Sequence, residues 1–226
     1  MKEYNYYLFD LDGTLTDPKV GITKSVQYAL KKKGIIIDDL TELEKFIGPP
    51  LHQSFSKYYG FDAHEAMECV ELYREYFKDR GITENTIYPF IADLLSFLKE
   101  THKKVILATS KPTVYARQIL EHFDIIDFFD QVVGSNLDLT RSDKTEIIAY
   151  IIVLMELSDK KDDMIMFGDR SHDLVGAINN GVDTAGVLYG YGSQDELQDC
   201  NPQYIFKDPQ ELFLQIRESI NTVKKV

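Results

Sequence analysis

The distribution of apolar residues predicts that short buried strands alternate with amphipathic helices along most of the chain. Beyond Pro89, mostly apolar runs of strand length occur at residues 105–108, 131–133, 164–167, 184–188 and 204–206. The segments between these runs place apolar residues every three or four positions, which is the spacing of one helix face. Strands that are apolar along their whole length are typical of a parallel sheet covered on both sides. We therefore expect a doubly wound, Rossmann-like α/β fold.

The helices predicted between these strands each present an apolar stripe to the sheet. One long helix has a core face made of Ile147, Ile148, Ile151, Leu154 and Met155. Further helices are expected around residues 91–98, 113–123, 174–178 and 212–220.

The N-terminal part of the chain follows a different pattern. Tyr6–Phe9 is a short apolar run that predicts a buried strand, and the residues after it show helical spacing instead of further strands. The first helical pattern stops at Gly34. A later one begins with the capping-box signature of Asp62 and Glu65 and ends near Gly81.

This change of pattern predicts two domains. The sheet-containing core comprises residues 1–16 and 89–226, and an all-helical cap of residues 17–88 is inserted into it. Proline follows both expected crossing points, so we place the hinges near Asp17-Pro18 and Tyr88-Pro89.

Composition and charge restrict the classes of function. The 226 residues suffice for one large domain or for one domain that carries a smaller insertion. The chain has 25 basic and 37 acidic residues, and its net charge of −12 repels a phosphate backbone, which argues against nucleic-acid binding. A small anionic substrate is compatible with this charge only where a metal ion and local basic groups offset it.

The sequence indicates a cytoplasmic protein that does not interact with membranes. The N-terminal residues MKEYNYYLFD have neither the apolar core nor the small-residue cleavage site of a secretory signal. No apolar run approaches the roughly 18 residues of a membrane-spanning helix. Cys69 and Cys200 match no metal-ligand spacing, and we interpret both as buried, reduced thiols.

Carboxylates follow the predicted strands at positions that converge in a parallel sheet. Asp10 and Asp12 follow the first strand, Asp169 follows residues 164–167, and Asp173 comes four residues later at a helix start. The carboxyl ends of parallel strands meet in one crevice, where ligands bind. Four carboxylates gathered there require a cation, and oxygen ligands of this kind suit Mg²⁺. The sequence therefore predicts a Mg²⁺ site at this edge of the sheet.

The spacing of the first two carboxylates indicates phosphoryl chemistry. In an extended chain, residues i and i+2 face the same way, so Asp10 and Asp12 can both reach one substrate. One carboxylate can attack phosphorus while the other protonates the leaving oxygen and later activates water. Gly13 permits the tight turn and the close approach of backbone and phosphate that this arrangement needs.

Groups that can bind a phosphate follow the second predicted strand. Thr109 offers a hydroxyl and Ser110 a backbone N–H at the mouth of a helix, whose N-terminus favours anions. Lys144 can supply a fixed positive charge between the phosphate and Asp10. Lys111 competes for that role, because it adjoins the phosphate-binding turn.

These motifs, taken in order, resemble the haloacid dehalogenase superfamily of phosphatases. FDLDGTL, LATSK, a lysine before a helix and GDRSHD cover nearly the whole chain, and the helical insertion after the first motif resembles the cap of the phosphoglycolate phosphatase-like branch. The resemblance implies that Asp10 is the nucleophile and Asp12 the general acid/base. It also implies that Thr109 supplies the hydroxyl and Lys144 the lysine of the second and third motifs.

The same resemblance implies a ligand set for Mg²⁺ and a loop that contacts the substrate. The metal ligands are Asp10, the backbone carbonyl of Asp12 and Asp169, with Asp173 acting through water. In the cap, Gly48 and Pro49 belong to FIGPPL, a loop of the kind that closes over the site and touches the leaving group. Lys24 and Arg74 are further candidates for contacts from the cap. GPP also suits a purely structural role, as the end of one helix and the start of another.

The function predicted from these features is Mg²⁺-dependent hydrolysis of a small phosphate monoester through an aspartyl-phosphate. Phosphoglycolate, a nucleoside monophosphate, a sugar phosphate and an aryl phosphate are all open as substrates. A phosphoryl-transferring mutase and a non-catalytic regulator that binds a phosphorylated ligand are the alternatives. Dehalogenation is disfavoured, because halide leaves without a proton or a metal ion. The sequence leaves the oligomeric state undetermined.

Overall fold

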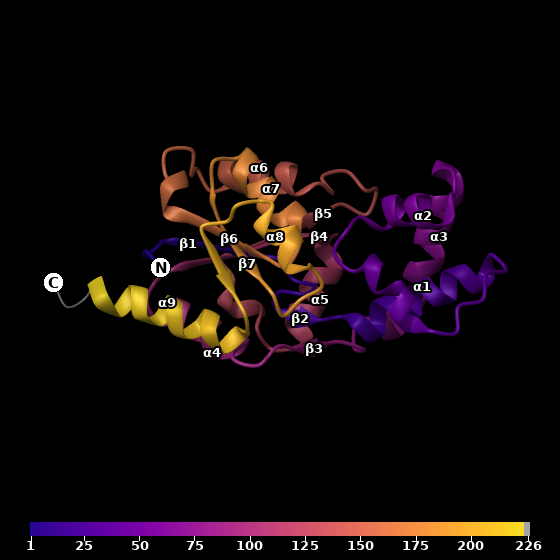
Figure 1. Ribbon diagram of the computed structural model, residues 1–226, viewed down its shortest axis with the longest axis horizontal. Coiled ribbons are helices and arrows are strands. Elements are labelled where there is room, and N and C mark those ends of the chain that lie inside the picture. The colour runs from indigo at the N-terminus through magenta and orange to yellow at the C-terminus, as the bar shows by residue number, and fades with distance from the viewer. Residues whose placement is uncertain (224–226) are drawn as a thin grey trace.

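The computed structural model describes residues 1–223, and a six-stranded sheet lies at its centre (Figure 1). All neighbouring strands run parallel, in the order β5-β4-β1-β6-β7-β8. The strands span Tyr6–Phe9 (β1), Lys104–Pro112 (β4), Gln131–Ser135 (β5), Met164–Gly168 (β6), Asp183–Val187 (β7) and Tyr204–Phe206 (β8). The chain builds outward from β1 in both directions, so the predicted doubly wound fold is confirmed and its switch point lies between β1 and β6.

Helices cover both faces of this sheet and create two apolar layers. Leu8 and Met166 lie in the layer on the side of α6 and α7, whereas Phe9 and Phe167 lie in the opposite layer, with ring centroids 4.9 Å apart. Successive residues of a strand face opposite sides, which is why Leu8 and Phe9 lie in different layers. The flanking helices are α4 (Ile91–Glu100), α5 (Thr113–His122), α6 (Lys144–Leu154), α7 (Ser171–Asn179) and α9 (Pro209–Val223), with short η3 (Ile126–Phe128), η4 (Lys161–Asp163) and α8 (Gln194–Gln198) between them.

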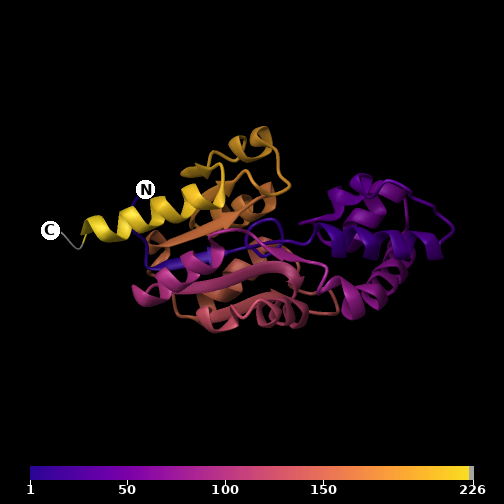
Figure 2. The ribbon, with the colours of Figure 1, turned by 90° about the horizontal axis from the view of Figure 1, so that it is seen from below.

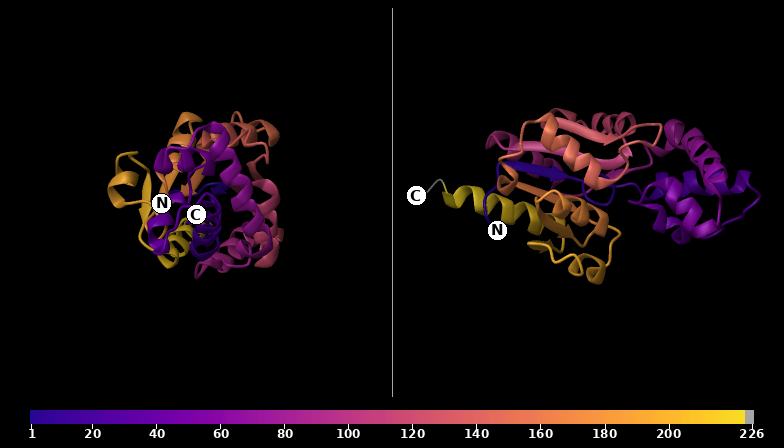
Figure 3. Two further views of the ribbon diagram at one scale, coloured as in Figure 1. Left: turned by 90° about the vertical axis from the view of Figure 1, so that its right-hand side faces the viewer. Right: turned by 90° about the horizontal axis from the view of Figure 1, so that it is seen from above.

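A group of helices lies beyond the end of the sheet opposite the N-terminus (Figures 2 and 3). The buried side chains of this helical unit join the larger apolar layer of the core. Asp62 and Glu65 form the predicted capping box, with N–H to carboxylate distances of 2.9 and 3.1 Å. No helix within residues 1–223 is both long and apolar enough to cross a membrane. The unit consists of α1 (Lys19–Lys32), η1 (Leu40–Phe46), α2 (Leu51–Tyr59), α3 (Ala63–Tyr76) and the π-helical η2 (Phe77–Gly81).

The chain enters and leaves the helical unit through a two-stranded antiparallel ribbon. It pairs β2 (Thr16–Asp17) with β3 (Thr86–Ile87), and the sequence pattern did not predict it. The hydroxyl of Tyr191 also contacts the carboxylate of Asp17, which ties the ribbon to the loop after β7. The division into a core of residues 1–16 and 89–226 and a cap of residues 17–88 stays a prediction.

Two details of the predicted core are wrong. Leu154 was expected on the core face of α6, but it is 45% exposed, and Ile152 is buried instead. The helix is apolar almost all round, so its sequence leaves its rotation about its own axis open. Cys69 is buried as expected, whereas Cys200 is only half-buried; both thiols are free.

The correction in α6 can be tested by comparing two truncations of similar size. Ile151→Ala should lower the free energy of unfolding by about 2–4 kcal/mol, because it leaves a cavity where the side chain is fully buried. Leu154→Ala should change it by less than about 1 kcal/mol, because that side chain is largely exposed. Urea unfolding followed by circular dichroism measures both values. Equal losses for the two variants would contradict the observed rotation of the helix.

Candidate active site

The two carboxylates after β1 lie on a tight turn with little freedom. The backbone N–H groups of Leu15 and Thr16 both donate to the carbonyl of Leu11, at 2.9 and 3.0 Å. Gly13 has φ of 84°, and a Cβ there would lie 2.2 Å from a carboxylate oxygen of Asp169. The turn therefore needs glycine both for its backbone conformation and for the approach of a second strand end.

Three carboxylates meet where β1 and β6 end. One oxygen from each of Asp10, Asp169 and Asp173 lies within 4.8 Å of the others, and all three residues are buried. Asp169 follows β6, and Asp173 lies in the first turn of α7. The carboxylate of Asp12, the fourth predicted acid, does not belong to this group.

Two lysines pair with these acids, and the structure gives each a separate partner. The ammonium of Lys144 lies 2.7 Å from Asp10 and 2.6 Å from Asp173, and it donates to a backbone carbonyl. The ammonium of Lys111 lies 2.7 Å from the carboxylate of Asp12. From the sequence we expected the two lysines to compete for one role. In the structure they pair with different acids, Lys144 with Asp10 and Asp173 and Lys111 with Asp12.

Burial dominates the electrostatics of the cluster. It raises the pKa of Asp169 well above its ordinary value, and the nearby Asp173 and Asp10 add to the shift. Burial also raises the pKa of Asp12, although Lys111 opposes this. For Lys144, burial alone would lower the pKa, but the charges of Asp10 and Asp173 outweigh it and raise the pKa of the ammonium.

The charges of the cluster fit a divalent cation. With Asp10, Asp169 and Asp173 ionised and Lys144 protonated, two negative charges stay buried without compensation. Carboxylate oxygens at this separation are hard ligands of the kind that Mg²⁺ or Ca²⁺ takes. The donor set therefore suits a doubly charged metal ion.

Thr109 and Ser110 lie inside β4 and not at the start of a helix. β4 continues to Pro112, with a register shift against β5 after Ala108, and α5 begins only at Thr113. The predicted end of the strand at residue 108 is therefore wrong. Thr109 is nevertheless buried at the edge where the acids meet, because its strand neighbours β1.

A pocket opens between the helical unit and the sheet, directly beside Asp12. Lys24 does not line it, since its ammonium pairs with Glu84 at 2.7 Å. The residues from the sequence prediction that line it are Asp12, Ser110 and Lys111 from the sheet side, and Gly48, Pro49 and Arg74 from the helical unit.

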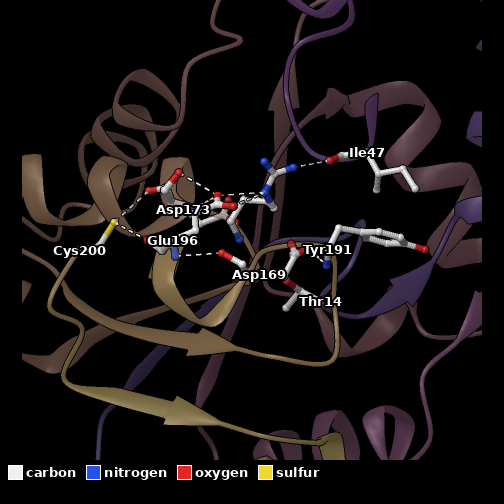
Figure 4. A network of polar contacts seen from close by, with 10 residues as sticks. Thr14, Ile47, Asp169, Asp173, Tyr191, Glu196 and Cys200 are labelled. Atoms are coloured by element: carbon white, nitrogen blue, oxygen red, sulfur yellow. Dashed lines mark hydrogen bonds and ion pairs between the residues drawn. The ribbon is translucent and has the colours of Figure 1, made fainter. Parts of the chain in front are cut away.

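Sequence reasoning missed a polar bridge between the sheet and the helical unit. The guanidinium of Arg170 donates to the carbonyl of Ile47 at 2.9 Å and also pairs with Glu196 at 3.0 Å. Figure 4 shows this network beside Asp169 and Asp173. Gly48 has φ of 101°, and a Cβ there would lie only 3.0 Å from the Arg170 side chain.

One residue of this bridge, Arg170, could have been inferred from the sequence. Arg170 lies inside GDRSHD, next to a predicted metal ligand, so its position at the site could have been inferred. The position of Glu196 could not, because nothing local distinguishes it from a solvent-exposed acid on a short helix. Tyr191, whose N–H donates to Asp169 at 2.8 Å, lies in the glycine-rich stretch YGYGS, which suggests a close backbone approach.

Comparison with known proteins identifies close relatives. Residues 7–187 match the haloacid dehalogenase-like hydrolase family. A 5'-nucleotidase of Pseudomonas aeruginosa is 47% identical over 205 residues, which cover 91% of this chain and 92% of that protein. The crystal structure of a predicted phosphatase from Clostridium acetobutylicum has a TM-score of 0.92 and 48% identity, covering 96% of this chain and 100% of that one.

A relative with a different name is also similar. The tyrosine-protein kinase PtkA of Mycobacterium tuberculosis is 36% identical over 188 residues. The match covers 83% of this chain but only 63% of that protein.

The strain of the acidic cluster predicts an unusual dependence of stability on pH. Folding raises the pKa of Asp173 from 3.8 to about 6 and also raises that of Asp169 well above its ordinary value, so the folded state binds more protons than the unfolded state in this range. Stability of the chelator-treated protein should therefore fall as the pH rises from about 4 to above 6. Asp169→Asn should raise the free energy of unfolding at pH 7 by about 1–3 kcal/mol. Urea unfolding at several pH values tests this.

The matched control is Asp159→Asn, which removes an exposed carboxylate and should leave the slope unchanged. A destabilised Asp169→Asn protein under chelation would show that the cluster is not strained.

The bridge from Arg170 predicts local protection of the loop before α2. Arg170→Met keeps the aliphatic stem but removes the charged donor to Ile47, a contact of about 1.5–3 kcal/mol. Amide hydrogen exchange over residues 43–48 should become roughly ten times faster or more. Arg217→Met, which removes an exposed arginine of α9, should have no effect there. Unchanged exchange in Arg170→Met would show that the contact does not restrain the loop.

Proposed function

Because this chain belongs to the haloacid dehalogenase-like hydrolases and is one of their phosphatases, we propose that it hydrolyses a small phosphate monoester with Mg²⁺ through an aspartyl-phosphate. The observation that carries the proposal is the unequal surroundings of two nearby carboxylates. Asp10 belongs to the acidic cluster and pairs with Lys144, whereas Asp12 pairs with Lys111 and lines the pocket. Two acids with different surroundings are suited to different roles in one reaction.

In the first step, a carboxylate oxygen of Asp10 attacks phosphorus, and the bond from phosphorus to the leaving oxygen breaks. The leaving oxygen takes its proton from the carboxyl of Asp12, whose raised pKa favours the protonated form. The products are an alcohol and a phosphoryl group bound to Asp10. The hydroxyl of Thr109 and the N–H of Ser110 bind the oxygens that do not react.

In the second step, water releases the phosphate. The ionised Asp12 takes a proton from water while the water oxygen attacks phosphorus, and the bond between phosphorus and Asp10 breaks. Inorganic phosphate leaves, the carboxylate of Asp10 is restored, and Asp12 is protonated again. The ion pair of Lys144 with Asp10 holds the nucleophile in place before the attack and forms again when the carboxylate of Asp10 is restored.

The uncompensated charge of the cluster supports Mg²⁺ as the cofactor. Asp10, Asp169 and the carbonyl of Asp12 would hold the ion directly, and Asp173 would contribute through water. When bound, Mg²⁺ offsets the negative charge of the phosphate that would otherwise repel an anionic nucleophile.

The similarity to a 5'-nucleotidase supports a small phosphorylated metabolite as the substrate, with nucleoside monophosphates among the candidates. A cytoplasmic location and the lack of nucleic-acid binding stay predictions from the sequence.

Phosphoryl transfer to an acceptor other than water is the second candidate. The similarity to a protein named as a tyrosine kinase favours it, and a mutase would share the same first step. The two functions differ in the fate of the phosphoryl group: hydrolysis releases inorganic phosphate, whereas transfer leaves it in an ester.

The proposal predicts that Asp10→Asn abolishes turnover while the protein stays folded. Loss of the nucleophile should reduce phosphate release from a panel of monoesters by about 10³-fold or more. Chelation should stop the wild-type enzyme, and added Mg²⁺ should restore it. The measurements are phosphate release and circular dichroism, with Asp159→Asn as the active control.

A second measurement follows labelled phosphate after an acid quench. Hydroxylamine-sensitive label on the wild-type protein, absent from Asp10→Asn, is expected for an acyl phosphate. Activity that survives chelation would remove the metal from the mechanism, and label recovered mainly in an ester would favour transfer over hydrolysis.

A further inference from the structure

The pocket beside Asp12 receives whatever is attached to the leaving oxygen, an inference that rests on the proposed function. Asp12 lines this pocket and is the group that protonates that oxygen. Ser110 and Lys111 line it as well, so it opens directly onto the phosphate-binding groups. The lining of the pocket therefore selects the leaving group.

The walls of this pocket are rich in aromatic rings. Tyr73 and Phe77 stack with centroids 5.3 Å apart, and Phe77 meets Tyr115 edge to face at 5.6 Å. Phe46 contributes a fourth ring from the loop side. Three of the rings come from the helical unit and one from α5. Both the helical unit and the sheet-containing core therefore contribute to the aromatic wall. Aromatic walls of this kind favour a flat apolar group with offset or edge contacts.

The cations that line the pocket are already paired. Lys111 binds Asp12 and lies 4.6 Å above the ring of Phe77. Arg74 binds Glu71 at 2.6 Å and donates to a backbone carbonyl at 2.8 Å. Lys111 adjoins the phosphate-binding groups, so its charge offsets the phosphate when Asp12 is protonated. Within the described part of the chain, neither lining cation is then left for an anionic leaving group. A buried carboxylate without such a partner is costly.

Two residues of the lining, Asp12 and His52, each have a buried polar atom without a hydrogen-bond partner among the described residues. Nδ1 of His52 is buried and makes no hydrogen bond to the residues that the structure describes. Burial lowers the pKa of this imidazole, so it is neutral at pH 7. Each ring nitrogen of a neutral imidazole can either donate or accept one hydrogen bond, so it can pair with an uncharged polar atom of a ligand.

From these contacts we propose that the leaving group is uncharged and carries an aromatic ring, which lies among Phe46, Tyr73, Phe77 and Tyr115. A polar atom of that group contacts His52. Phosphoglycolate and pyrophosphate do not fit, because their leaving groups are anions. Nucleosides and simple aryl alcohols share the required chemistry.

Three monoesters whose leaving alcohols have similar basicity test the proposal. Benzyl phosphate should exceed cyclohexylmethyl phosphate in kcat/KM by about 2- to 12-fold, because only the flat ring makes aromatic contacts. It should exceed phosphoglycolate by about 100-fold, because the carboxylate would be buried unpaired. Phosphoglycolate turned over as fast as benzyl phosphate would overturn the proposal.

A variant of the pocket and a matched control distinguish the contribution of the Tyr115 ring to substrate preference from general effects of losing an aromatic side chain. Tyr115→Leu should reduce the preference for benzyl over cyclohexylmethyl phosphate to below about 2-fold. Phe97→Leu removes a comparable edge contact, with Phe213 at 6.1 Å, between α4 and α9, and should keep the wild-type preference. An unchanged preference in Tyr115→Leu would exclude this ring from recognition of the leaving group.

Binding of phosphonates makes the result independent of turnover. In these compounds a methylene replaces the leaving oxygen, and 2-phenylethylphosphonate should bind more tightly than 2-cyclohexylethylphosphonate and 3-phosphonopropionate by calorimetry with Mg²⁺. If no ester is hydrolysed but this order of affinity holds, the phosphatase proposal fails and the assignment of the pocket stands. If esters are hydrolysed but 3-phosphonopropionate binds best, the phosphatase proposal stands and the assignment of the pocket fails.

The two sources of an aromatic leaving group are distinguished by a second pair of substrates. A ratio of kcat/KM for uridine 5'-monophosphate over ribose 5-phosphate that exceeds the ratio for benzyl over cyclohexylmethyl phosphate supports a nucleoside. A ratio near one supports an aryl alcohol.

Discussion

The burial of three carboxylates, two of which pair with one ammonium, is the constraint on which the rest of the structure depends. Asp10 follows β1 and Asp169 follows β6, the two strands on either side of the switch point of the sheet. Asp173 and Lys144 come from the helices α7 and α6, which cover one face. Such a concentration of like charge is unfavourable unless a cation offsets it, so the fold creates at this point a donor set that suits a divalent metal ion.

The same point in the structure connects the chemistry to the helical unit. Arg170 adjoins Asp169 in the chain and reaches across to the carbonyl of Ile47, and Lys111 joins Asp12 to the ring of Phe77. The helical unit is therefore in contact with the partner of Asp12 and with the chain next to the acidic cluster. In the proposed function this arrangement separates two tasks: the sheet supplies the groups that act on the phosphate, and the helical unit supplies most of the aromatic rings of the pocket.

The fold was predictable where a local pattern admits one structure. The apolar runs predicted where along the chain the strands of the core occur, and the capping box predicted the start of α3. The apolar pattern gave a wrong prediction where it is compatible with more than one arrangement of the same element. Almost every side of α6 is apolar, so the prediction placed Leu154 inside. The end of β4 was missed because its last residues pair with β5 through a register shift, which depends on another strand.

For the site, the sequence alone determined that Asp10, Asp169 and Asp173 converge. Acids that follow neighbouring parallel strands must lie at one edge of the sheet, and this holds whatever the details of packing. It could not determine which partner each group takes. Segments far apart in the chain meet in three places: in the separate ion pairs of Lys144 and Lys111, in the bridge from Arg170 to Ile47, and in the aromatic walls of the pocket. Only the tertiary structure decides such contacts, because their distances depend on how whole elements pack and not on local sequence.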